Sequence, residues 1–142
     1  MPTLQYAADI ALLPAGLQCP PADAAREART CFRFVFDPLG SGSFLPVGKI
    51  TPQRVHTAKG PLACSMLALS MFSTENKARA KYAAVLKTNP NAPKTLGTHL
   101  AKGNVSANDG ASTPITSSGH FDFHPYVDAH LDSDFVIIGP LP

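Results

Sequence analysis

The side chains most able to do chemistry lie together near the C-terminus, in the segment His120-Phe121-Asp122-Phe123-His124. In an extended chain successive side chains point to opposite faces, so His120, Asp122 and His124 would share one face. Imidazole titrates near neutral pH, and a carboxylate can orient an imidazole for proton transfer. We therefore predict that His120, Asp122 and His124 are the catalytic residues of an acid/base site.

A second interpretation of this segment is a half-exposed strand whose polar face has no catalytic role. The histidines would then bond only to backbone groups or water. Motifs that bind a metal specifically place their ligands at known spacings, and this segment matches none of them. No metal and no other cofactor is therefore predicted.

Positive charge for a ligand is expected from residues outside this segment. Arg33 lies in the middle of an apolar segment, where a charge needs a partner, so it is either half of an ion pair or an anion-binding group in a cleft. Basic side chains can hold a phosphate or carboxylate group. The predicted ligand-binding residues are Arg33, Arg54, His99 and Ser73.

The strands that must position these residues are indicated by β-branched and aromatic segments that end at turn residues. We predict strands at 30–36, 67–72, 95–102, 120–124 and 134–139, with the first and the last of these buried. Residues 62–67 are apolar enough for either a helix or a strand. Residues 43–50 are expected to be extended, 51–61 to be a loop, and 104–118 to be a mobile loop.

The clearest helix signal covers 74–87. Ala78, Tyr82 and Val85 fall on one face, Thr74 is a suitable N-cap, and Asn89-Pro90 ends the pattern. Two further helical turns are expected at 22–29. The sequence thus predicts a single α+β domain over 1–142, with 1–28 as a loosely structured packing arm. Its sheet, mixed or antiparallel, has about four to six short strands, and the helix 74–87 packs on it.

Composition limits the partners and the location. The net charge of +2 is too small to indicate nucleic-acid binding, and no apolar segment reaches the length of a membrane span. Only 15% of the residues are charged, so apolar side chains share the surface, which suits a homo-oligomer. The N-terminal residues lack the pattern of a secretory signal, so a cytoplasmic protein is predicted.

The cysteines are odd in number and widely spaced. Cys19, Cys31 and Cys64 match neither a disulfide framework nor a zinc motif. Cys31 and Cys64 lie in apolar segments and are predicted to be buried, and Cys19 to be more exposed.

Two short stretches, Phe32-Arg33-Phe34 and Leu69 to Thr74, resemble in outline the compact α+β transferases of the ADP-ribosyltransferase type. Such folds place an Arg or His on a first core strand and a Ser or Thr at a later strand end. The glutamate that these enzymes carry on a late strand is missing, because no glutamate follows Glu75. The resemblance therefore does not extend to the catalytic residue of that family.

Two functions are consistent with the sequence. The first is a small enzyme with a cleft formed by the His/Asp segment, acting on an anionic or nucleotide-like small ligand. The alternative is a non-catalytic protein-binding module, such as a regulatory or immunity-type partner. The enzyme requires the His/Asp segment in a concave pocket, whereas the module requires it on an open surface.

Overall fold

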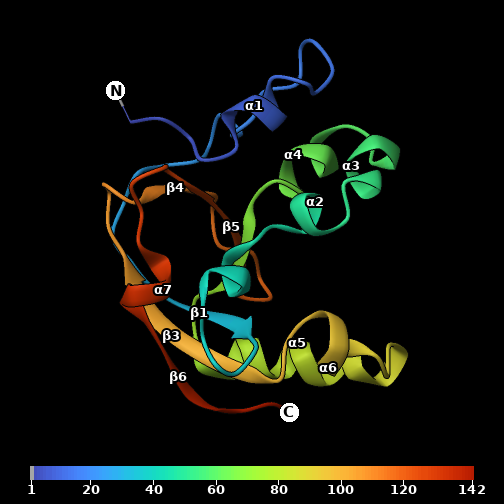
Figure 1. Ribbon diagram of the computed structural model, residues 1–142, viewed down its shortest axis with the longest axis vertical. Coiled ribbons are helices and arrows are strands. Elements are labelled where there is room, and N and C mark those ends of the chain that lie inside the picture. The colour runs from blue at the N-terminus through green and yellow to red at the C-terminus, as the bar shows by residue number, and fades with distance from the viewer. Residues whose placement is uncertain (1) are drawn as a thin grey trace.

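A six-stranded antiparallel sheet forms the centre of the molecule in the computed structural model, which describes residues 2–142 (Figure 1). The strand order is β4-β5-β2-β1-β3-β6, and every neighbouring pair is antiparallel. The predicted α+β class is therefore confirmed. The strands are β1 (Arg29–Val35), β2 (Leu69–Phe72), β3 (His99–Val105), β4 (Gly110–Ser112), β5 (His120–Pro125) and β6 (Phe135–Pro140).

Alternation along the strands creates two apolar layers. One face of the sheet carries the larger core, to which β1, β2 and β5 contribute alternate residues such as Cys31, Met71 and Phe123. The other face carries a smaller cluster that contains Phe32, Phe72 and Leu100. Since β1 has buried residues in both layers, it is the central strand that its sequence predicts.

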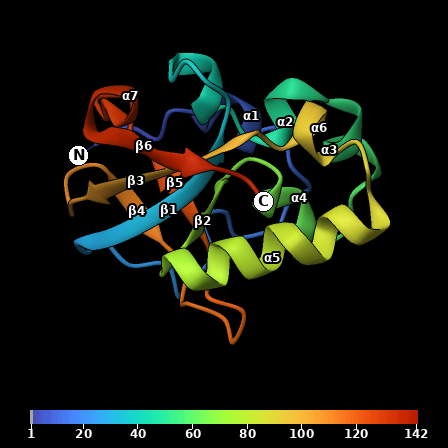
Figure 2. The same cartoon turned by 90° about the horizontal axis from the view of Figure 1, so that it is seen from below.

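The long helix α5 (Glu75–Thr88) covers the smaller cluster, and Figure 2 shows it lying across the sheet. Its N-cap is Thr74, whose Oγ1 accepts a hydrogen bond from the backbone N–H of Lys77 at 3.2 Å. Ala78 and Tyr82 are completely buried, and the Tyr82 hydroxyl donates to the carbonyl of Gly97 at 2.9 Å. The predicted helix 74–87 is thus confirmed to within one residue at each end.

Short helices fill the connections between strands. They are α1 (Ala7–Ile10), η1, a 3-10 helix (Ser41–Phe44), α2 (Val47–Ile50), α3 (Gln53–Thr57), α4 (Pro61–Ser65), α6 (Ala92–Thr95) and α7 (Leu131–Asp134). The extended segment predicted at 43–50 and the loop predicted at 51–61 are therefore wrong. Single helical turns of this length are stabilised by packing on the sheet and leave little periodicity in the sequence. The undecided segment 62–67 lies largely in α4.

Three further boundaries differ from the predictions. Residue 95 ends α6, and β3 begins at His99 and continues through Gly103 to Val105. Gly103 lies within the strand because the ring of Phe135 occupies the place where a Cβ would stand. Residues 104–118 are not one loop, since they contain β4. The two helical turns predicted at 22–29 are absent from the described chain. There, Ala25 instead forms a β-bridge with Ser112.

The last strand, β6, is an edge strand and not the buried strand predicted at 134–139. Phe135 is buried, whereas Val136 is 61% exposed, so only alternate residues face the core. The prediction was wrong because a continuous apolar segment is typical of a strand that is covered on both faces.

Two of the three cysteines are covalently joined. Cys19 and Cys64 form a disulfide across 45 residues of sequence, whereas the sequence predicted no disulfide. Cys31 is a free, buried thiol, as predicted. Burial raises the pKa of Cys31 to about 12, so this thiol is protonated at neutral pH. Within residues 2–142, no helix is long and apolar enough to cross a bilayer.

Candidate functional site

The three predicted catalytic residues share one face of β5, but their surroundings differ. Strand β5 pairs with β2 so that Asp122 lies opposite Ser70 and His120 lies opposite Phe72. His120 and Asp122 are half-buried, whereas His124 is 1% exposed. The alternation Phe121/Phe123 versus His/Asp/His holds, because both phenylalanines lie in the larger core.

His120 is held between a hydroxyl and a carboxylate. Its Nε2 lies 3.0 Å from Oγ of Ser70 and 3.7 Å from Oδ1 of Asp122. The ring of His120 also packs edge-on against Phe72, with the ring centroids 5.5 Å apart. One imidazole nitrogen therefore faces both a potential nucleophile and a negative charge.

Asp122 is fixed by its neighbours. Its Oδ2 accepts a hydrogen bond from the hydroxyl of Ser65 at 2.8 Å, and its backbone N–H donates to Oγ1 of Thr113 at 2.8 Å. Its Oδ1 is buried and has no hydrogen-bond partner within residues 2–142. This oxygen is the one that faces His120, and a protonated His120 ring would give it a partner.

The protonation of His120 follows from three opposing influences. Burial lowers its pKa, the carboxylate of Asp122 raises it, and the ammonium group of Lys81 lowers it, so that the pKa ends below the usual 6.5. His120 is consequently neutral at pH 7. A neutral imidazole with Nε2 unprotonated can accept the proton of the Ser70 hydroxyl.

A cleft of about 330 Å³ opens beside Ser70, at the end of the sheet where β1 stops and β2 begins. Residues of η1, α2, α3, α4 and α6 contribute to its lining. None of the residues from 2–142 that line it is acidic. The lining includes Arg33, Phe34, Phe36, Leu45, Arg54, Ser65 and Ser70.

Arg33 provides a fixed positive charge in this cleft. Its guanidinium donates to the backbone carbonyls of Ser43 at 2.9 Å, Ser70 at 2.9 Å and Leu45 at 3.3 Å. No carboxylate of residues 2–142 lies within ion-pair distance of the Arg33 guanidinium. Among these residues Arg33 is therefore not half of an ion pair, which was one of its two predicted roles. Burial lowers its pKa to about 10, so Arg33 is charged at neutral pH.

Of the other three predicted ligand-binding residues, one lines the cleft and two do not. Arg54, on α3, lines the same cleft as Arg33. His99 lies apart on β3, where its Nδ1 is 2.9 Å from Oγ1 of Thr98 and its Nε2 is 3.9 Å from Oδ2 of Asp37. Ser73 follows β2 and does not line the cleft. His99 and Ser73 are therefore not part of this site.

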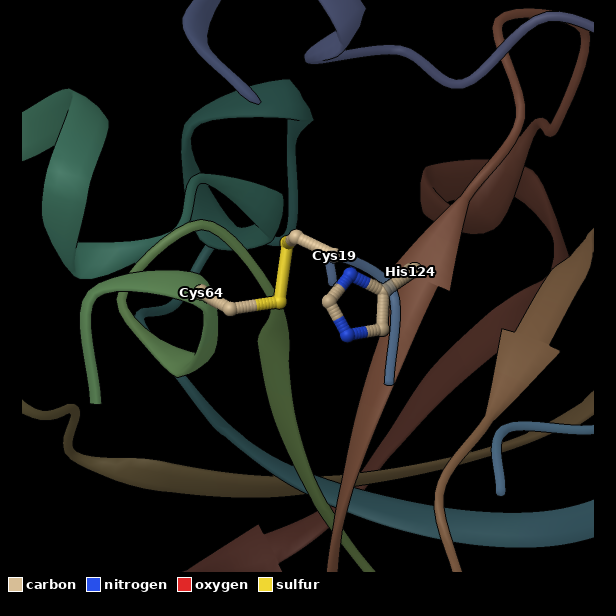
Figure 3. A group of neighbouring side chains, drawn as sticks. All are labelled: Cys19, Cys64 and His124. Atoms are coloured by element: carbon tan, nitrogen blue, oxygen red, sulfur yellow. A yellow bond between two sulfur atoms is a disulfide. The ribbon is translucent and has the colours of Figure 1, made fainter. Parts of the chain in front are cut away.

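His124 has a different environment, although it is only four residues from His120. Its ring lies against the Cys19–Cys64 disulfide (Figure 3), and neither ring nitrogen has a hydrogen-bond partner within residues 2–142. Burial lowers the pKa of His124 more than Asp122 raises it, so this ring is neutral. None of the three predicted catalytic residues lines the cleft itself. His120 reaches it through Ser70, and Asp122 lies next to His120, whereas His124 lies apart at the disulfide.

Neither Ser65 nor Ser70 is among the residues predicted from the sequence. Ser70 alternates with the buried residues Leu69 and Met71, so its exposure could have been predicted. Its position beside His120 depends on the pairing of β2 with β5, which the alternation does not reveal.

Comparisons with known proteins add no assignment. No family model, no curated protein sequence and no solved structure matches the chain. The geometry of the cleft and of the two histidines is therefore the basis on which a function can be proposed.

Proposed function

We propose that the protein is an enzyme that binds a small anionic, nucleotide-like ligand in the 330 Å³ cleft and transfers an acyl or phosphoryl group through Ser70. The observation that carries this proposal is the 3.0 Å contact between Nε2 of His120 and Oγ of Ser70, a serine that lines the cleft. A neutral imidazole at hydrogen-bond distance from an exposed hydroxyl is the arrangement that activates a serine nucleophile.

The reaction that fits these groups has two steps. Oγ of Ser70 attacks the electrophilic carbon or phosphorus of the ligand while His120 Nε2 takes the hydroxyl proton. The bond to the leaving group then breaks, and the leaving group receives that proton from His120. Water, deprotonated by His120, hydrolyses the resulting ester and restores the Ser70 hydroxyl.

Asp122 has a specific part in this scheme. Its Oδ1 lies 3.7 Å from the nitrogen of His120 that gains the proton. In a half-buried setting the carboxylate stabilises the imidazolium that forms, and it gains the partner that it lacks in the resting state. The arrangement differs from a serine-protease triad, where the acid contacts the other ring nitrogen.

The ligand class follows from the charge and shape of the cleft. Arg33 and Arg54 are both basic, and no acidic residue from 2–142 lines the cleft. A phosphate or carboxylate group would be attracted there, and the guanidinium of Arg33 still has N–H groups free to donate. The rings of Phe34 and Phe36 supply an apolar wall for a flat, nucleobase-like part of the ligand.

A second function, the non-catalytic protein-binding module, is favoured by one observation. Phe36, Leu45 and Ile50 line the same cleft and are 39%, 39% and 59% exposed. Exposed apolar side chains around a pocket are typical of surfaces that receive a side chain of a partner protein. In that case Ser70 and His120 would form part of the rim and would perform no chemistry.

The test uses a fluorophosphonate probe and a panel of p-nitrophenyl esters and phosphates that carry a second anionic group. We expect the probe to label Ser70, located by peptide mass spectrometry, and Ser70→Ala to abolish both labelling and turnover. Ser73→Ala is the matched control, because Ser73 lies close by in sequence but outside the cleft. Labelling that is equal in Ser70→Ala, together with turnover that this substitution leaves unchanged, would contradict the enzyme and leave the binding module.

The disulfide provides a test of the predicted cytoplasmic location. The Cys19–Cys64 disulfide is of a kind that reducing compartments disfavour. Trapping the thiols with a mass-labelled maleimide at the moment of cell lysis measures which form is present. Free Cys19 and Cys64 thiols would support the cytoplasm, and a protected pair would support an oxidising compartment.

A further inference from the structure

A second group of side chains able to bind a ligand lies at the other end of β5, outside the cleft. The sulfurs of Cys19 and Cys64 and a ring nitrogen of His124 all lie within 4.8 Å of one another (Figure 3). They come from three separate parts of the chain, namely the irregular segment 11–28, helix α4 and strand β5. Two cysteines and a histidine are the ligand types that zinc prefers.

We propose that the reduced form of the protein binds a zinc ion through Cys19, Cys64 and His124. A dithiol or phosphine reductant supplies the two electrons that break the sulfur–sulfur bond, and two protons from solvent complete the two thiols. Zinc then displaces those protons as it binds the two thiolates. The same three residues thus have two states, an oxidised disulfide and a reduced metal site.

The state of His124 is the independent observation that points to a ligand. Its side chain is 1% exposed, and both ring nitrogens lack a hydrogen-bond partner within residues 2–142. A buried polar group without a partner is destabilising, so most such groups in native proteins are bonded. A metal ion at the sulfurs would give one ring nitrogen a bond that no protein group provides.

The surroundings allow the change from disulfide to metal site. Zinc–sulfur bonds of about 2.3 Å at a tetrahedral angle require the two sulfurs to lie about 3.8 Å apart. Cys64 is held in α4, but Cys19 is half-buried in a segment without helix or strand, so no helix or strand hydrogen bonds fix the backbone at Cys19. Since Cys19 is also reached by solvent, a water molecule can occupy the fourth position.

Zinc fits these ligands better than the hard cations do. Two thiolates and an imidazole favour Zn²⁺ over Mg²⁺ and Ca²⁺, which prefer oxygen ligands.

The experiment compares the purified protein with and without tris(2-carboxyethyl)phosphine in metal-free buffer. Zn²⁺ uptake is followed by native mass spectrometry and by calorimetry, and Co²⁺ serves as a spectroscopic probe for thiolate ligation. We expect the reduced protein to bind one Zn²⁺ and to show the thiolate-to-Co²⁺ absorption, and the oxidised protein to show neither. Cys31→Ala is the matched control, because Cys31 is a free cysteine outside the group.

The variants assign the ligands. Loss of a residue that only hydrogen-bonds to a metal ligand weakens metal binding by roughly 10- to 100-fold. We expect Cys19→Ser, Cys64→Ser and His124→Leu each to weaken Zn²⁺ binding by more than this, because each removes a ligand itself. Circular dichroism on the same samples shows whether each variant is folded. Absence of Zn²⁺ uptake by the reduced wild type, uptake by the oxidised protein, or uptake unchanged in His124→Leu would each overturn the proposal.

Discussion

His120 and His124 lie four residues apart on the same face of the same strand, yet they have opposite surroundings. His120 is half-exposed, and its Nε2 contacts a hydroxyl and faces a carboxylate. His124 is covered by the disulfide, and neither of its nitrogens has a hydrogen-bond partner within residues 2–142. The difference shows that a shared strand face does not make a shared site. What covers each position decides whether a side chain can meet a substrate.

The difference between His120 and His124 can be tested first through catalysis. If His120 is the base, His120→Ala should reduce turnover of a substrate found with the ester and phosphate panel by about 100- to 10,000-fold, the range typical of a positioned acid/base group. His124→Leu, assayed on the oxidised protein, should change turnover little, because His124 lies against the disulfide and does not contact Ser70. The measurement is kcat/KM for both variants.

The disulfide beside His124 should have the next largest effect, this time on stability. Closing a loop of 45 residues corresponds to about 4 kcal/mol in the chain-entropy model. Reduction of the metal-free protein should therefore lower the free energy of unfolding by about 2–4 kcal/mol, measured by urea denaturation.

A matched pair of variants identifies the source of that loss. Cys31→Ala should still lose stability on reduction, whereas Cys64→Ser should not respond to the reductant at all. A reduced wild type as stable as the oxidised one would show that the disulfide does not hold segment 11–28 against α4.

Replacement of His124 by an apolar residue should have a smaller and unusual effect. Because both ring nitrogens are buried without partners, His124→Leu removes a destabilising feature while it keeps most of the packing. In the oxidised protein we expect the free energy of unfolding to stay the same or rise by about 1 kcal/mol. His120→Leu, at the exposed end, should not raise it, and a loss of several kcal/mol in His124→Leu would reveal a partner for this ring.

The smallest expected effects are shifts in the pKa of His120, followed by NMR of the imidazole protons. Asp122 raises this pKa, so Asp122→Asn should move the titration to lower pH; Lys81 lowers it, so Lys81→Met should move it to higher pH. Because neutral His120 is the base, the rate should fall as pH drops through this pKa. If the His120 titration curve of both variants is the same as that of the wild type, neither group interacts with the ring.

Parts of the fold follow from local sequence alone. The helix α5 needed only its N-cap, its apolar face and the Asn-Pro after it, and β1 needed only its aromatic and β-branched residues. The short helices between β1 and β2 could not be predicted in this way. A single helical turn is unstable by itself, and only contact with the rest of the fold stabilises it.

The sequence by itself determined that His120, Asp122 and His124 would share a face, because strand geometry alternates side chains with a period of two. It also determined that Arg33 would carry a charge in a largely apolar strand. The tertiary structure decided the rest: it placed Ser70 beside His120, gave Arg33 three backbone carbonyls and joined Cys19 to Cys64 over His124. The physical reason is that strand pairing and chain crossing depend on contacts between distant segments, which local pattern does not contain.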